Sequence, residues 1–532
     1  MAGPFDPRAL VEQLRRRLPD SPPRTVGGVC PGARAVAIAA LARDGCTVVV
    51  VPAARDAEDL AHGLALIAPE LPACALPVEA IDPGIGRRAP LGATAAASLA
   101  LARLAAGDLR VLIVPARILP FAVPPPAALT RRAPRVAVGE VVDPHSLVAA
   151  LVEAGYRRVE IVEEAGDVAV RGEIVDVGTP DRFVRIGLDI DRVEHIAEFD
   201  PDSQRSGAAL PEVVLPPLSL FAASEEVRAS LAARLETAGC AALAAAVLDG
   251  RAPESWEALL GWVQPAVAAW QLGSALVVCE RAAVAAEIDR TLQAARRAVE
   301  TLAREGTTLP PPEEWLRSAD DCAVILGAAD VVDELAIEDG TPWVRVATAP
   351  TANLASRPQA LIDELKGNAW SGKVQGVVAA TAGELQRLQH LFAEAELPVR
   401  HGWAPPGVIG LVAGELTRGF TWGNDVVIFG RSDVTTMPAP ARQRRTLGRV
   451  LAEMRDLTPG DWVVHIDHGI GRFLGFRSFA FEGEAHDCVE LEYSGGGKLL
   501  VPLERADCLE KYAGADSTAP HLDRLGGSSW AR

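Results

Sequence analysis

Two uninterrupted apolar segments constrain most strongly what the first part of this chain can fold into. They read CTVVVVPA at 46–53 and RVLIVPA at 110–116, and helical stretches such as 56–66 lie between them. A strand that is apolar along its whole length is buried on both faces, as is typical of parallel sheets. Because such strands alternate with helices, the pattern predicts an α/β domain with a mostly parallel sheet.

Residues 156–206 follow a different pattern, in which apolar and polar residues alternate. Every second residue from Val184 to Ile190 is apolar, so these side chains are predicted on one face of a strand. Short strands of this kind, joined by glycine and aspartate turns, predict a small antiparallel domain. Buried strands are predicted again at 274–280 and 321–328. We therefore expect the antiparallel unit to be inserted into one α/β domain.

A third unit is predicted further along the chain, since a length of 532 residues is too great for one core. Residues 376–381 are predicted as a strand, and Thr381 forms a capping box with Glu384 at the start of a helix. The predicted divisions are an α/β domain in two parts at 1–125 and 214–348, an inserted β-rich domain at 126–213, a linker at 349–372, a small α/β domain at 373–434, a second linker at 435–456, a small β unit at 457–514 and a terminal connection at 515–532.

The composition excludes several classes of protein. The net charge of −18 argues against a surface that clamps DNA all round. The eight cysteines are scattered without a CxxC pair, which favours reduced thiols over a zinc ribbon or a disulfide framework. The first residues lack the apolar core of a signal peptide, and no apolar run reaches the roughly 18 residues of a membrane span. We expect a cytoplasmic monomer with no membrane segment.

The segment GGVCPGARAVAIAAL lies where a phosphate-binding loop would lie, before a helix in an α/β unit. A working loop needs GxxxxGK[ST], whose lysine contacts phosphate and whose hydroxyl holds Mg²⁺. Counting from Gly28 places Arg34 and Ala35 at the lysine and Ser/Thr positions. Matching the two motif glycines to Gly27 and Gly32 places Ala33 and Arg34 at the lysine and Ser/Thr positions instead. No register supplies the hydroxyl, and a helicase-like acidic strand end is also missing, so we expect a relic of a P-loop with no catalytic residue.

The segment VVHIDHGIGRFLGF at 463–476 brings together two histidines, an aspartate and three glycines. Along an extended strand His465 and His468 lie on opposite faces, so they cannot ligate one metal ion together. The pattern instead predicts a tight turn, DHGIG, between two strands. Four of the twelve phenylalanines follow within nine residues, and each is open to a role in the core or at an interface: Phe473, Phe476, Phe479 and Phe481.

Residues 457–514 resemble the RNA polymerase-interaction module of the bacterial transcription-repair coupling factors, a Tudor-like small β-barrel related to CarD. The shared motifs are GDWVVHIDHGIGRF, LEY and KLLVP. RGEIVDV at 171–177 and IAEFDPDSQRS at 196–206 resemble the damage-recognition protein UvrB and the matching domain of the coupling factors. The resemblance covers the whole chain. It implies UvrB-like α/β domains without their ATPase, with an insert that binds UvrA.

The resemblance also implies site residues. UvrA is expected to contact the insert through Arg157 and Arg171, while Gly178 replaces an aromatic residue that is frequent in the family after the RGEIVDV-like strand. The β subunit of RNA polymerase is expected to contact Phe479, with Phe476 and Arg472 as further contacts. Pairing of backbone strands would contribute affinity, and side-chain pockets would contribute specificity.

The implied function is transcription-coupled nucleotide excision repair, with this chain as the scaffold that binds stalled RNA polymerase and recruits UvrA. The family continues into a translocase motor that uses ATP and Mg²⁺ and makes most contacts with double-stranded DNA. Neither that motor nor its cofactors are expected here, so we expect the chain to be a fragment of a longer product. The alternatives are a UvrB-like ATP-dependent helicase and a CarD-like transcription regulator.

Overall fold

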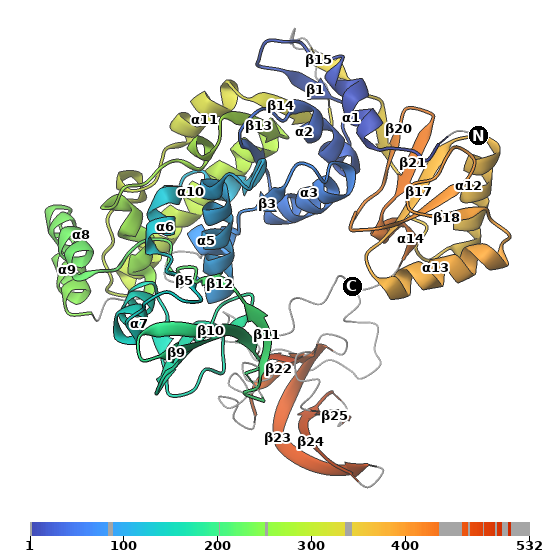
Figure 1. Ribbon diagram of the computed structural model, residues 1–532. Helices are drawn as coiled ribbons and strands as arrows, with labels where there is room; N and C mark the ends of the chain where they lie inside the picture. Colours follow the sequence, from blue (N-terminus) through green and yellow to red (C-terminus); the bar gives the residue numbers. More distant parts are fainter. Residues whose placement is uncertain are drawn as a thin grey trace. The chain divides into compact units, whose positions relative to one another are not determined.

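The chain forms two compact units, residues 1–436 and 437–532 (Figure 1). The computed structural model describes residues 3–82, 89–201, 203–250, 254–335, 343–435, 460–465, 469–481, 484–494, 497–502 and 509–511. The predicted connection at 515–532 and all but the first residue of the linker predicted at 435–456 lie outside these ranges. In the described part of the chain, no helix has the length and apolarity needed to cross a bilayer.

A seven-stranded parallel sheet organises the first unit, with strand order β15-β1-β14-β13-β2-β4-β3. Strands β2 and β4 are buried along their whole length, as their apolar runs predict. The sheet unites strands from before and after the antiparallel unit, as expected for an insertion. The strands are β1 (Thr25–Gly27), β2 (Thr47–Val51), β3 (Ala73–Ala75), β4 (Val111–Pro115), β13 (Ala275–Cys279), β14 (Asp330–Asp333) and β15 (Trp343–Arg345).

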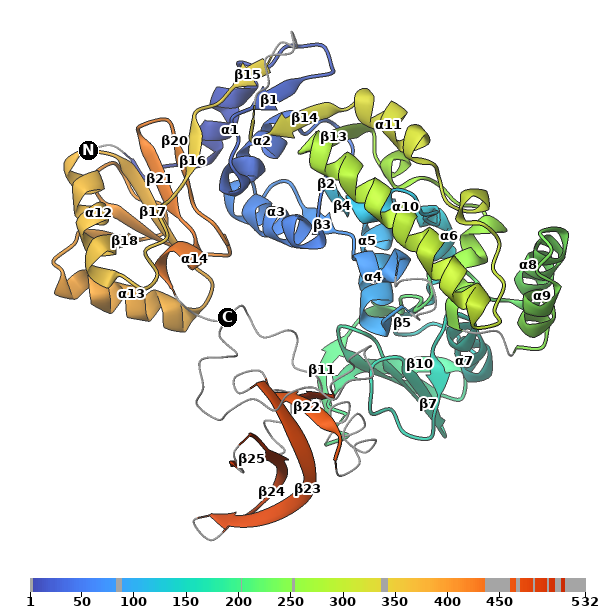
Figure 2. The same cartoon turned by 180° about the vertical axis from the view of Figure 1, so that it is seen from behind.

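Helices cover both faces of this sheet. Val49 and Val51 of β2 pack in one apolar cluster with α1 (Arg8–Arg15), α2 (Arg34–Leu41) and α3 (Ala54–Ile67). Val48 and Val50 face the opposite way and join a second cluster, which includes residues of α5 (Leu91–Ala106) and α10 (Arg281–Arg304). Figure 2 shows the long helix α10 across that second face. Alternate burial on two sides is what makes the strand apolar throughout.

The prediction of a strand at 321–328 is wrong, because all but the last of these residues belong to the helix α11 (Ala319–Gly327). Ser318 caps the helix: its hydroxyl accepts a hydrogen bond from the amide of Asp321, whose carboxylate accepts one from the Ser318 amide. Cys322 and Leu326 of α11 are buried, four residues apart on one helical face. The strand of this region, β14, begins only at Asp330.

The inserted domain contains a six-stranded sheet in the order β11-β10-β9-β8-β7-β6. All neighbours pair antiparallel except β6 and β7, which are parallel. Val184, Ile186 and Leu188 are buried as predicted, and α7 (Pro144–Glu153) packs against the same core. The strands are β6 (Arg157–Arg158), β7 (Asp167–Arg171), β8 (Ile174–Gly178), β9 (Phe183–Asp189), β10 (Arg192–Phe199) and β11 (Ser206–Leu210).

Ile190 departs from the predicted alternation, since it is 80% exposed rather than buried beside Leu188. The pairing of Asp189 with Arg192 leaves Ile190 and Asp191 as the two-residue turn between β9 and β10. Ile190 has a φ of 60°, a left-handed conformation that a strand does not allow. The turn therefore removes this side chain from the core face.

The third sheet has the order β16-β20-β21-β17-β19-β18. Strands β21, β17, β19 and β18 are parallel, and β16 and β20 pair antiparallel at one edge. The capping box predicted at Thr381 and Glu384 opens α13 (Ala382–Glu394). The strands are β16 (Thr348–Pro350), β17 (Val374–Ala379), β18 (Val399–His401), β19 (Ile409–Ala413), β20 (Phe420–Trp422) and β21 (Val426–Phe429).

The segment 349–372 is not the loop-like linker that the sequence predicts. It contains most of β16 and the helix α12 (Pro358–Trp370). Pro358 occupies the first helical position, where its missing amide hydrogen costs no bond. Leu361 and Leu365 of α12 pack into the core of the third sheet, so this segment is part of that unit.

The second unit is a five-stranded antiparallel sheet in the order β25-β24-β23-β22-β26. The predicted pairing of two strands is confirmed, because Val463 pairs with Gly471 and His465 with Gly469. The predicted DHGIG turn is too long, since β23 begins at Gly469. The connecting residues at 466–468 lie outside the described ranges, and closure into a Tudor-like barrel remains a prediction. The strands are β22 (Trp462–His465), β23 (Gly469–Phe481), β24 (Glu484–Glu492), β25 (Lys498–Pro502) and β26 (Leu509–Lys511).

Candidate functional site

The segment that the sequence predicts to be a P-loop relic lies between β1 and α2, with a short 3-10 turn at Pro31–Ala33. Gly28 has a φ of +82°, and a side chain there would collide with the carbonyl oxygen of Val346. A β-carbon on Gly32 would lie 2.5 Å from the carbonyl oxygen of Arg418 and 2.8 Å from that of Gly419. Backbone carbonyl groups therefore pack directly against the loop. Their oxygen atoms are the negative ends of the carbonyl dipoles, so they disfavour a phosphate group at this place.

Arg34, at one of the two predicted lysine positions, has a buried side chain that is 9% exposed. Its Nη2 donates to Oε1 of Glu280 at 3.0 Å, and its Nη1 lies 3.7 Å from Oδ1 of Asp56. The same Glu280 oxygen accepts a hydrogen bond from the amide of Glu334 at 2.9 Å. The charge that would face a phosphate is thus used in an internal ion pair, which holds β13 and the residue after β14 against α2.

The carboxyl ends of β13 and β14 add acidic and thiol groups beside the loop. Burial raises the pKa of the Asp333 carboxyl above its ordinary value, and burial raises the pKa of the Cys279 thiol to about 12. A thiol with this pKa is neutral at physiological pH and is a poor nucleophile. Within the described ranges, no group of three or more His, Cys, Asp or Glu side chains is arranged to hold a metal ion.

A small cavity of about 160 Å³ adjoins the loop. Thr417 lines it and donates a hydrogen bond to Asp59, another lining residue, at 2.5 Å. Typical ligand pockets measure roughly 300–1,000 Å³, so this space is small for a nucleotide. Its charged lining residues are Arg34, Arg55, Asp56, Asp59 and Arg418.

The close packing at Gly32 leads to the first prediction. Gly32→Ala is expected to destabilise the contact between the loop and residues 418–419 by about 1–3 kcal/mol, because an added methyl group overpacks it. Gly92→Ala is the matched control, since its new methyl group would meet open space and should be neutral or slightly stabilising. Hydrogen exchange at 416–419 measures the effect, and equal protection in both variants would contradict it.

The inserted domain ties each of the two predicted arginines to a buried aspartate. Nη2 of Arg157 in β6 lies 2.8 Å from Asp167, and Nη2 of Arg171, at the end of β7, lies 2.5 Å from Asp176. Arg157 pairs in register with Asp167, and Arg171 follows Asp167 by four residues on the same strand. The two arginines are therefore offset by about 13 Å along the direction of these neighbouring strands, from a rise of about 3.3 Å per residue.

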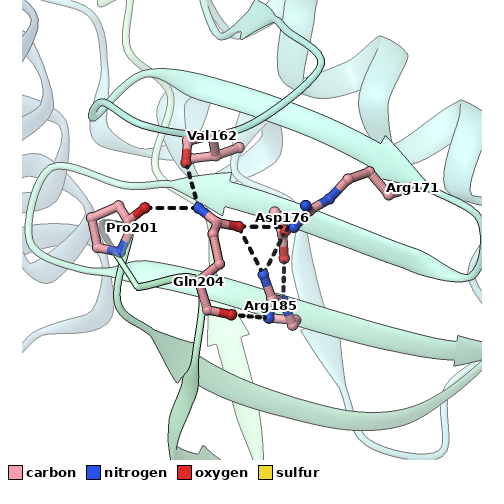
Figure 3. A network of polar contacts seen from close by, with 6 residues as sticks. All are labelled: Val162, Arg171, Asp176, Arg185, Pro201 and Gln204. Atoms are coloured by element: carbon pink, nitrogen blue, oxygen red, sulfur yellow. Dashed lines mark hydrogen bonds and ion pairs between the residues drawn. The ribbon is translucent and has the colours of Figure 1, made fainter.

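Asp176 is the centre of a polar network that the sequence did not predict (Figure 3). Its side chain is 1% exposed, and Arg185 donates to it through Nε at 2.7 Å and Nη2 at 3.0 Å. Gln204 accepts through Oε1 from Arg171 at 3.0 Å and from Arg185 at 3.3 Å. The side-chain amide nitrogen of Gln204, Nε2, donates to the backbone carbonyl oxygens of Pro201 and Val162. One buried carboxylate thus organises three strands and a turn, and an aspartate between valines in an apolar strand was its only sequence signal.

The fold requires a glycine at position 178 for a steric reason. A side chain at this position would collide with the carbonyl oxygen of Glu164 and would lie 3.1 Å from the ring of Phe183. Phe183 faces Gly178 across the strands and packs edge-on against Phe199 at 5.8 Å between ring centroids. The aromatic group beside this position therefore comes from the neighbouring strand.

The three residues predicted to bind the polymerase lie on β23. Arg472 pairs in register with Glu492 and forms an ion pair with it at 2.9 Å while staying half-exposed. Phe476 and Phe479 pair with Val489 and His486 of β24; their side chains lie outside what the structure describes. Of the four clustered phenylalanines, Phe473 is buried at 1% exposure and belongs to the core.

Two family models match parts of this chain. The model of the UvrB interaction domain matches residues 135–221, and that of the CarD-like/TRCF RID domain matches residues 457–513. The chain is therefore a multidomain α/β protein that contains a UvrB interaction domain and a CarD-like domain.

Curated relatives identify the family that the chain resembles. The transcription-repair-coupling factor of Mycobacterium tuberculosis is 30% identical over 98% of this chain and 46% of the relative. Those of Myxococcus xanthus and Bacillus subtilis are 29% and 24% identical over 79% and 81% of this chain, and 39% and 40% of their own length. The predicted resemblance to the N-terminal half of the transcription-repair coupling factors is confirmed. The chain spans about half the length of these relatives or less.

Proposed function

We propose that this chain is an interaction scaffold in transcription-coupled nucleotide excision repair. Its CarD-like domain binds the β subunit of RNA polymerase stalled at a DNA lesion, and its inserted domain recruits UvrA. The observation that carries the proposal is the presence of both domains, at 135–221 and 457–513, in one chain related to the coupling factors. A chain with two docking domains brings two partners together at high effective concentration.

The P-loop relic supports a scaffold without nucleotide chemistry of its own. Arg34 is engaged by Glu280, and the carbonyl groups of 418–419 pack against Gly32. Ala35 has no hydroxyl for a metal ion. ATP, Mg²⁺ and most contacts with double-stranded DNA are assigned to the motor of the full-length family, and the chain itself is proposed to act as a monomer.

Separate titrations test this proposal. The purified chain is titrated with the polymerase β subunit and, in a second series, with UvrA. Saturable binding in both series is the expected result, and no binding in either would contradict the scaffold. Binding of polymerase alone would favour the CarD-like regulator.

The UvrB-like helicase is tested by steady-state hydrolysis of Mg·ATP, with and without DNA. The chain is expected to show no turnover above a Gly32→Ala control. Turnover that this substitution abolishes would overturn the scaffold account, because it would place working chemistry at the loop.

A further inference from the structure

We propose that Asp176 and Gln204 are positioning residues that hold Arg171 as a preformed anchor for a carboxylate group on the partner of the inserted domain. This inference rests on the proposed binding of UvrA to this domain. The four side chains of the network are Arg171, Asp176, Arg185 and Gln204 (Figure 3).

The charges of the network favour an anionic partner group. The single carboxylate of Asp176 is shared by two guanidinium groups, so one positive charge is left over. Arg185 is 11% exposed and stacks on the ring of Phe199 at 4.6 Å, which fixes its charge inside the domain. Arg171 is 37% exposed. The surplus charge is therefore presented to solvent by Arg171.

The geometry leaves two separate nitrogens of this guanidinium group available to a partner. Both bonds that hold Arg171 run through Nη2, to Asp176 and to Gln204. Among the described residues, neither Nε nor Nη1 of Arg171 has a hydrogen-bond partner. Both guanidinium edges with two parallel N–H donors include Nη2, so a carboxylate of the partner is bound here through a single charge-assisted hydrogen bond from Nε or Nη1. An aspartate or glutamate of the partner supplies such an acceptor.

Gln204 fixes the orientation of the anchor. Its backbone has a φ of 57°, in a turn where its amide donates to the carbonyl oxygen of Asp200 at 2.8 Å. Its side chain uses the carbonyl end for the two arginines and the amide end for Val162 and Pro201. Reversing the amide group would break all of these bonds. An arginine ordered before binding loses less conformational entropy when the partner arrives.

A double-mutant cycle tests the positioning role. The affinity for UvrA is measured for the unmodified chain, Gln204→Ala, Arg171→Ala and the double variant. We expect Gln204→Ala to weaken binding about three- to tenfold and the double variant to bind no more weakly than Arg171→Ala. If Gln204→Ala weakens binding by the same factor in both backgrounds, or in neither, the positioning role is contradicted.

Two further variants separate this role from a general loss of structure. Gln204→Glu keeps an acceptor for both arginines but cancels the surplus charge, so it is expected to weaken binding and to flatten its salt dependence. Gln359→Ala, on α12, removes a glutamine that donates a local hydrogen bond to Asp363 and should leave affinity unchanged. Unchanged affinity and salt dependence in Gln204→Glu would contradict the carboxylate assignment.

The same UvrA-binding measurements tell a failure of the positioning role from a failure of the proposed function. If the unmodified chain does not bind UvrA, the proposed function fails. If Arg171→Ala weakens binding and Gln204→Ala does not, only the positioning role fails. Binding of the polymerase β subunit by every variant reports that the second unit is intact.

Discussion

Replacing Phe479 by arginine is expected to abolish binding of the polymerase β subunit, with a loss of about a hundredfold or more. Phe479 lies in the distal part of the hairpin formed by β23 and β24, opposite His486. If this strand docks on the polymerase, the substitution places an unpaired charge in an apolar contact, and the cost of desolvating that charge opposes binding. Surface plasmon resonance with the immobilised β subunit measures the change.

Phe479→Leu is the matched control for this substitution, because it keeps an apolar side chain at the same position. It should retain affinity within about tenfold. UvrA binding should be unaffected in both variants, since it is assigned to the inserted domain. Equal affinity of Phe479→Arg and the unmodified chain for the polymerase would contradict the assigned surface.

Arg171→Ala is expected to weaken UvrA binding by about thirtyfold or more, as is typical of an arginine that anchors an interface. The substitution removes the partner-facing charge and leaves Asp176 paired with Arg185 alone. It should not weaken binding of the polymerase. Isothermal titration calorimetry with UvrA measures the loss, and repeating it at higher ionic strength should show a smaller salt dependence than that of the unmodified chain.

Arg135→Ala provides the control for Arg171→Ala. Arg135 belongs to the same domain, is exposed, and forms ion pairs with Glu140 and Glu212, and such exposed pairs contribute little to stability. Its substitution should leave UvrA binding within about twofold. Loss of both UvrA and polymerase binding in Arg171→Ala would indicate misfolding rather than loss of an anchor.

The parallel sheet was predictable from the sequence because burial on both faces makes β2 and β4 apolar throughout. The segment 321–328 is also largely apolar, yet the Ser318 cap and the four-residue spacing of Cys322 and Leu326 make it a helix. Short apolar runs carry this ambiguity. Ile190 shows a second limit, since alternation does not reveal where a strand gives way to its turn.

The network at Asp176 was not predictable, because it joins residues that are distant in the sequence. Gln204 meets Arg171 across 33 positions, and Arg34 meets Glu280 across 246. Sequence spacing describes contacts within one helix or strand and does not show which turns converge in space. Arg171 itself was identified through a family resemblance. The steric need for glycine at position 178 is visible only once the position of the Glu164 carbonyl oxygen is known.

Binding of both partners to the unmodified chain, Phe479→Arg and Arg171→Ala, in one set of titrations, tests the central claim most directly. The account predicts that the unmodified chain binds the polymerase β subunit and UvrA, that Phe479→Arg binds only UvrA, and that Arg171→Ala keeps full affinity for the polymerase alone. Two substitutions that each weakened both interactions, or neither, would contradict a scaffold with two separate docking surfaces.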